Sequence, residues 1–205
     1  MNLIGNCCIS NCISRIKGEG NTNPFTWIDL DFKSLYYLIT NWENVDWDDF
    51  ELNKVKHPYQ NCDLFEIVIE NKVHLRYIHY LYKKTAHTPK VYSVDVHYCK
   101  IWEYIVQKYE ERTKRMLDTN DPPVFITEWE HLDYNEAAFW KIEKEHLKYK
   151  LVVITYNTHL KTDNPNILVI YDPHGRGGGY RGAGHRLPDW YAKTYYKQIM
   201  KFITE

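Results

Sequence analysis

The amino-acid sequence predicts an α/β or α+β fold, a single compact domain in which helices pack on a mixed central sheet. The main observation is that segments with the two-residue alternation of strands interleave with segments whose apolar residues recur at helical spacing. The second is length, because 205 residues are many for one domain but few for two. The third is a content of 44% hydrophobic and 26% charged residues, which is typical of a chain with its own core.

The first predicted elements are a short strand, a tight turn and a short helix. An apolar segment at residues 2–5 leads into Asn6-Cys7-Cys8, and isoleucines then recur near helical spacing. Asn23-Pro24-Phe25-Thr26-Trp27 predicts a rigid aromatic turn, because a proline moves the preceding residue out of the α region. Asp31 can then cap a helix whose apolar stripe consists of Phe32, Leu35, Tyr36 and Ile39.

The middle of the chain predicts a β-hairpin followed by the longest helix. Residues 64–70 alternate between apolar and polar, and the alternation resumes after Asn71-Lys72. Its period places His79 at the far end of the apolar face. The helix is predicted over residues 95–116 and must end before the two prolines that follow.

The last third predicts three buried strands and two helices. The strands are expected at residues 124–127, 151–156 and 167–171, where β-branched and other apolar residues run together. A capping-box-like start predicts a helix from residue 133 to about residue 146, and Asp189 can cap the final helix.

Charge and cysteine usage exclude several classes of protein. With 26 Lys+Arg against 27 Asp+Glu, no global field attracts nucleic acid, so no nucleic-acid partner is predicted. No apolar run approaches the roughly 18 residues that a transmembrane helix needs. The five cysteines are odd in number and irregularly spaced, and no signal-peptide core follows Met1. We therefore expect reduced thiols and a soluble, cytoplasmic protein.

Three cysteines gather directly after the first predicted strand. A thiol in the first turn of a helix faces the positive end of the dipole and unpaired N–H groups, which favour the thiolate and can hold an oxyanion. Cys8 fits this position best, because Cys7 lies in the turn and Cys12 one turn further along. Two alternatives stay open: the thiols pack as small apolar groups, or Cys8 and Cys12 form half of a metal site. No CxxC pair or HExxH motif is present, so neither a metal nor a cofactor is predicted.

A cysteine nucleophile needs a base within hydrogen-bond reach, oriented by a third group. Among ten histidines, His79 is the best candidate, because it lies in phase with the apolar face of its strand. The alternative is a histidine satisfied within the core or at the sheet margin. Asp95 at the start of a helix and Asp172 at the end of a strand are both able to orient an imidazole, and Asp95 is taken into the predicted catalytic set.

A glycine- and arginine-rich stretch at residues 173–188 follows the strand predicted at residues 167–171. Ligands of α/β proteins bind at the carboxyl ends of strands. Three glycines satisfy GxGxxG in form, but the next helix begins only near Asp189 and the lysine of a P-loop is absent. Arginines and histidines among glycines can still hold a phosphate or a carboxylate; the alternative is a surface loop without a ligand. The predicted ligand-binding residues are His174, Arg176, Arg181, His185 and Arg186.

Several of these segments resemble a family of poorly characterised microbial and viral proteins described as papain-like cysteine peptidases. Some relatives are associated with polysaccharide biosynthesis. The resemblance covers about residues 3–130 and rests on Ile4-Gly5-Asn6-Cys7-Cys8, on Asn23-Pro24-Phe25-Thr26-Trp27 and on the strand ending in His79. It implies that Cys8 is the family's cysteine and His79 its histidine, whereas Thr26 stands where the family has an aspartate.

Three functions follow as hypotheses. The first is a cysteine hydrolase or acyl-transfer enzyme acting on a protein, peptide or glycan. The second is a sugar-nucleotide-dependent or other glycan-modifying enzyme of surface polysaccharide biosynthesis, in which the 173–188 stretch holds a phosphate-containing ligand. The third is a non-catalytic interaction module, since 16% of the residues are aromatic and such rings are common at binding surfaces.

Overall fold

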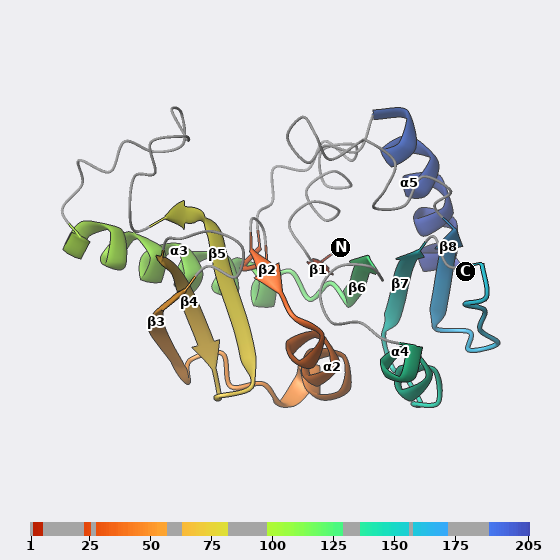
Figure 1. Ribbon diagram of the computed structural model, residues 1–205, viewed down its shortest axis with the longest axis horizontal. Helices are drawn as coiled ribbons and strands as arrows, with labels where there is room; N and C mark the ends of the chain where they lie inside the picture. Colours follow the sequence, from red (N-terminus) through yellow and green to blue (C-terminus); the bar gives the residue numbers. More distant parts are fainter. Residues whose placement is uncertain are drawn as a thin grey trace.

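The computed structural model confirms the mixed α/β class and divides the strands between two sheets (Figure 1). It describes residues 2–5, 23–25, 28–56, 63–81, 98–128, 136–155, 158–171 and 189–205.

The first sheet is parallel throughout, with the strand order β1-β6-β7-β8. Its strands are β1 (Asn2–Gly5), β6 (Pro123–Glu128), β7 (Lys150–Thr155) and β8 (Ile167–Tyr171). Gly5 lies opposite Ile126 in the register of β1 and β6. All four were predicted from their apolar runs, with ends that differ by at most one residue.

The second sheet is antiparallel, with the strand order β2-β5-β4-β3. Its strands are β2 (Asp29–Leu30), β3 (Phe50–Lys56), β4 (Asp63–Ile69) and β5 (Val73–Leu81). The predicted hairpin is β4 and β5. Its turn carries Glu70 at φ 51° and Asn71 at φ 54°, and the amide of Lys72 donates to the carbonyl of Ile69 over 2.9 Å. Two consecutive left-handed residues are the pattern of a type I′ turn.

One mixed sheet was expected, and two separate sheets are observed. Parallel neighbours need a long crossover, and a helix lies between β6 and β7. The turn between β4 and β5 is far too short for a crossover, so these two strands pair antiparallel, and β3 pairs antiparallel with β4 in the same sheet.

The helices begin and end close to the predicted positions. Asp31 caps α2 (Phe32–Asn41), and its carboxylate accepts the Ser34 amide over 2.8 Å. A short 3-10 helix, η1 (Trp42–Asn44), follows directly. α3 is described from Tyr98, and Asp95, its predicted start, lies outside the described residues; α4 ends at Glu143 instead of near residue 146. The ranges are α3 (Tyr98–Asp118), α4 (Glu136–Glu143) and α5 (Asp189–Thr204).

Both sheets contribute to one hydrophobic core. Phe125 of the parallel sheet and Leu75 of the antiparallel sheet are fully buried in the same cluster, together with Tyr109 of α3. A second cluster lies on the other face of the parallel sheet, where Tyr195 and Ile199 of α5 pack on Val152 and its neighbours. The parallel sheet is therefore buried on both faces. Within the part of the chain described, every helix is too short or too polar to cross a membrane.

Candidate functional site

The carboxyl ends of the parallel strands form one edge, at which β1, β6, β7 and β8 end at Gly5, Glu128, Thr155 and Tyr171. In Figure 1, β7 and β8 run upward, so this edge is the upper one. The chain continues from β1 into residues 6–8 and from β8 into residues 172–174. The two stretches to which the sequence assigned chemistry therefore leave the same edge, which is where α/β sheets bind ligands.

Gly5, the last residue of β1, lies tightly against β6. A Cβ placed on it would lie 2.0 Å from the carbonyl oxygen of Ile126 and 2.8 Å from the Ile126 Cγ2. Real Cβ atoms do not come this close, so only glycine lets β1 end at this distance from β6. The glycine before the cysteines is required for packing, whatever role the cysteines have.

Two asparagines fix the rest of β1. The amide nitrogen of Asn2 donates to the carbonyl of Met116 over 3.1 Å and to that of Asp121 over 3.2 Å, which ties the start of β1 to the end of α3. The amide nitrogen of Asn23 donates to the carbonyl of Leu3 over 2.7 Å. Among the described strands β1 lies at the edge of its sheet, and there the second bond supplies a partner for a backbone carbonyl.

Most of the predicted site residues lie outside the described residues. These are the cysteines at 7, 8 and 12, the aspartates at 95 and 172, and the whole 173–188 stretch with His174, Arg176, Arg181, His185 and Arg186. Cys8 and Asp95 as catalytic residues, and the ligand-binding set, remain predictions.

His79 lies within β5, of which only the backbone is described at this position. Up to Tyr77 the expected alternation holds, because Val73, Leu75 and Tyr77 are buried. The ladder then shifts: Phe65 pairs with Tyr77, whereas Leu64 pairs with Leu81. His79 falls inside this irregularity and its side chain lies outside the described part of the structure, so its placement on the apolar face stays a prediction. Its role as a base remains a prediction.

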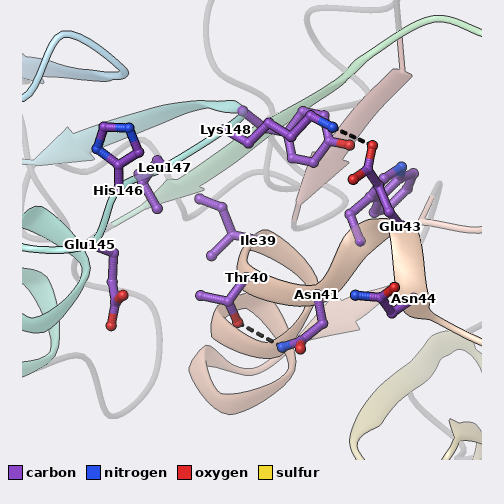
Figure 2. A pocket seen from close by; sticks show the side chains of 11 residues that line it. Ile39, Thr40, Asn41, Glu43, Asn44, Glu145, His146, Leu147 and Lys148 are labelled. Atoms are coloured by element: carbon purple, nitrogen blue, oxygen red, sulfur yellow. Dashed lines mark hydrogen bonds and ion pairs between the residues drawn. The ribbon is translucent and has the colours of Figure 1, made fainter.

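A pocket of about 170 Å³ opens between the end of α2 with η1 and the segment that leads from α4 into β7 (Figure 2). Ile39 and Leu147 supply its apolar surface, and Figure 2 shows Glu145 and His146 facing Thr40 and Asn41 across it. Because residues 145–149 directly precede β7, the pocket lies at the amino edge of the parallel sheet, away from the ends of β1 and β8.

Three charged side chains that line this pocket have partners: Glu43, Lys148 and Glu145. Lys148 forms an ion pair with Glu43, and the hydrogen bonds from Lys148 and Tyr149 lower the pKa of that carboxyl. The hydroxyl of Tyr36 donates to Glu145 over 2.7 Å, and this bond, with partial burial, raises the tyrosine pKa. Of its lining, only Thr40 carries an aliphatic hydroxyl, and it donates to helix carbonyls. The arrangement suits the binding of a small polar group better than covalent catalysis.

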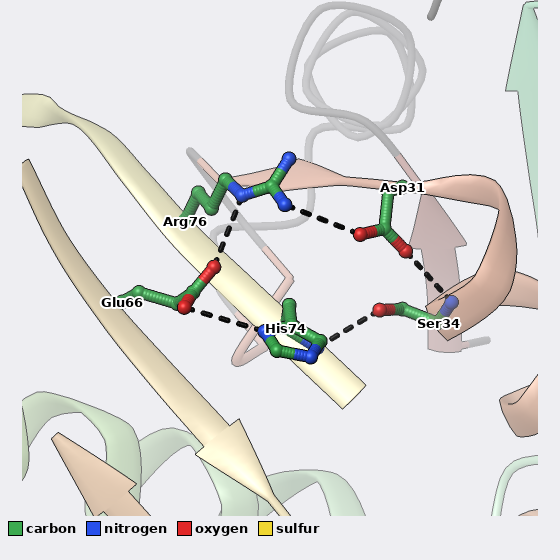
Figure 3. Close-up of polar contacts among 5 residues, drawn as sticks. All are labelled: Asp31, Ser34, Glu66, His74 and Arg76. Carbon is green, nitrogen blue, oxygen red and sulfur yellow. Dashed lines mark hydrogen bonds and ion pairs between the residues drawn. The ribbon is translucent and has the colours of Figure 1, made fainter. Parts of the chain in front are cut away.

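A buried carboxylate organises the hairpin face beside α2 (Figure 3). Glu66 is 5% exposed and binds Arg76 Nε over 3.0 Å and His74 Nδ1 over 3.3 Å. Arg76 also reaches the carboxylate of Asp31 over 3.3 Å, and the His74 amide donates to the Ser34 hydroxyl over 2.9 Å. These bonds join the first turn of α2 to β4 and β5, so the network has a structural role.

Neither the pocket nor this network was predicted from the sequence. The sequence did hold a signal for Glu66. It is a carboxylate within a predicted strand, and the next strand of the hairpin carries a histidine and an arginine that could pair with it. The pocket had no such signal, because residues 39–44 and 145–149 are brought together only by the fold. Across the described ranges, histidine, cysteine, aspartate and glutamate side chains form no group of three or more that could hold a metal ion. No protein-family model matches the chain, and no curated protein matches it significantly.

Proposed function

We propose that the chain is a cysteine-nucleophile enzyme of hydrolysis or acyl transfer, with Cys8 as the nucleophile. The observation that carries the proposal is the end of β1. Gly5 fits between the strands only as glycine, at the carboxyl edge of a parallel sheet buried on both faces, and Cys8 follows three residues later. Such an edge is the usual place for a ligand in an α/β protein. The resemblance to papain-like cysteine peptidases supports the same assignment.

In the proposed reaction the Cys8 thiolate attacks the carbonyl carbon of a protein, peptide or glycan substrate. His79 takes the thiol proton and returns it to the leaving group, and backbone N–H groups after Gly5 bind the oxyanion. The leaving group departs as the thioester forms. Water or an acceptor nucleophile then releases the acyl group and regenerates the thiol. Asp95 orients the imidazole. A reactive thiolate of this kind needs reduced cysteines, which agrees with a cytoplasmic location.

The test is the alkylation of each cysteine by iodoacetamide across pH, read by peptide mapping. Cys8 should react with an apparent pKa below the ordinary thiol value of about 8.5 and faster than Cys62. His79→Gln should move that pKa back toward the ordinary value. His74→Gln is the matched control, because His74 lies on the same strand and binds Glu66. Alkylation of Cys8 no faster than that of Cys62 at every pH would rule the nucleophile out.

A second candidate is a glycan-modifying enzyme that uses a sugar nucleotide. It is favoured by the end of β8 at Tyr171 on the same edge, directly before the stretch that holds Arg176 and Arg181. Arginines there could bind a diphosphate. Hydrogen exchange of residues 173–188, with and without UDP-, GDP- and CMP-sugars, tests it. Protection by one sugar nucleotide, with an unreactive Cys8, would favour this candidate over the cysteine enzyme.

A further inference from the structure

We propose that Asn23 is the positioning residue of the nucleophile segment, a role that rests on the proposed function of Cys8. The chain leaves the described structure at Gly5 and returns at Asn23. The side chain of Asn23 joins these two points, because its amide nitrogen donates to the carbonyl of Leu3 over 2.7 Å. The Asn23 side chain therefore links the two points of the described structure between which residues 6–22, with their three cysteines, are inserted.

The Asn23 end of this bond is held by contacts of the neighbouring Phe25 in the core. The carbonyl oxygen of Asn23 accepts the amide of Phe25 over 3.0 Å, which makes an Asx turn around Pro24. Phe25 is fully buried and its ring lies 6.1 Å from that of Trp47 and 6.4 Å from that of Trp42. Asn23 is thereby tied to the core on one side and to β1 on the other.

The bond to Leu3 helps to fix the position of the end of β1, from which the chain continues toward Cys8. Leu3 lies two residues before Gly5, and Gly5 is packed against the Ile126 carbonyl. Without the bond, the outer side of β1 loses the partner that the Asn23 side chain supplies at Leu3. A displacement of about 1 Å in a reacting group can lower a rate on the order of 10²-fold. Loss of the bond is therefore expected to act on the cysteine more than on the fold.

Asn164 provides a matched control. Its carbonyl oxygen accepts the amide of Asn166 over 3.0 Å, and its amide nitrogen donates to the carbonyl of Glu143 over 3.0 Å. The side chain therefore makes the same two kinds of bond as Asn23, an Asx turn and a bridge to a distant carbonyl. It does so between α4 and β8, at the edge of the parallel sheet opposite to the end of β1.

The experiment compares Asn23→Ala with Asn164→Ala in the full chain. Two quantities are measured: the alkylation rate of Cys8 across pH, and the rate at which a protease cleaves within residues 6–22. We expect Asn23→Ala to slow alkylation of Cys8 by about tenfold or more, to raise its apparent pKa and to speed cleavage. Asn164→Ala should leave the alkylation rate of Cys8, its apparent pKa and the cleavage rate near their wild-type values, at a similar loss of thermal stability. If Asn23→Ala fails to fold, Asn23→Asp replaces it, because the carboxylate keeps the acceptor for Phe25 and lacks the donor for Leu3.

Equal effects of the two alanine variants on Cys8 and on cleavage would overturn the proposal, and so would no effect of either. The proposed function fails in a different way, when wild-type Cys8 reacts like Cys62. In that event the cleavage rate still tests the role of Asn23. Faster cleavage in Asn23→Ala alone would support Asn23 as the residue that holds residues 6–22, and unchanged cleavage would rule this role out.

Discussion

Replacement of Gly5 by alanine tests the packing at the end of β1. The added Cβ would lie 2.0 Å from the Ile126 carbonyl oxygen, and a tolerable contact begins at 3.0 Å. The two strands must therefore move apart by about 1 Å at this pair. The obstacle is backbone of a strand with neighbours on both sides, so it cannot move as a side chain can. Overpacking of this kind costs about 1–3 kcal/mol, and we expect about 3 kcal/mol here.

Urea unfolding and calorimetry of Gly5→Ala measure this cost. For a chain of this size, about 3 kcal/mol corresponds to a fall in Tm of about 6–12 °C. A double-mutant cycle with Ile126→Ala identifies the clashing atom, because that change removes Cγ2 and leaves the carbonyl oxygen. We expect a coupling within about 0.5 kcal/mol of zero. A loss of less than about 0.5 kcal/mol in Gly5→Ala, or its rescue by Ile126→Ala, would refute the backbone clash.

Substitutions at Glu70, Tyr109 and Arg76 test other parts of the fold. Glu70→Ala should lower the free energy of unfolding by about 1–3 kcal/mol, because its carboxylate accepts bonds from a tyrosine hydroxyl and a backbone amide. Glu70→Gly should lower the free energy of unfolding by about 1 kcal/mol less than Glu70→Ala, because the backbone φ at this position is 51°, which favours glycine. Equal losses of the two variants in urea titrations would contradict this backbone strain. Burial raises the pKa of Tyr109 above its ordinary 10.0, so its contribution to stability is complete below pH 10 and is lost as the pH rises. Tyr109→Phe should flatten that alkaline loss, and an unchanged profile of stability against pH would show that Tyr109 does not cause it. Arg76→Met should destabilise by about 3 kcal/mol by leaving the Glu66 carboxylate short of a partner, and Glu66→Gln in the same chain should recover part of it. No recovery in thermal unfolding would mean that Arg76 acts through packing alone.

The sequence predicted the strands and helices whose side chains alternate or recur strongly. β8 begins and ends at the predicted residues, and the stripe of α2 faces the core as expected at Leu35 and Ile39. β3 was not predicted, because it is an edge strand whose polar residues break the two-residue pattern. β2 has only two residues and depends on its partner β5 for its existence. Both misses are strands set by tertiary pairing.

The candidate site was predictable only as far as local pattern extends. The strand before Gly5 and the cap at Asp31 follow from neighbouring residues, and both are confirmed. The bonds of Asn2 and Asn23 to backbone carbonyls could not be predicted, since their partners are selected by the fold. The irregular pairing between β4 and β5 that surrounds His79 could not be predicted either, because a periodicity argument does not detect it.

The parallel sheet also constrains the order in which the chain can acquire its structure. Among the described strands, β1 pairs with β6 alone, so residues 2–5 find this partner only once residues 123–126 exist. The hairpin of β4 and β5 needs only neighbouring residues and can form early during synthesis. Contacts that close so long a stretch of chain form slowly. Ribosome-bound chains that end before residue 123 should therefore hold an ordered hairpin and an unpaired N-terminus, and the edge that carries the cysteine segment should be the last part to assemble.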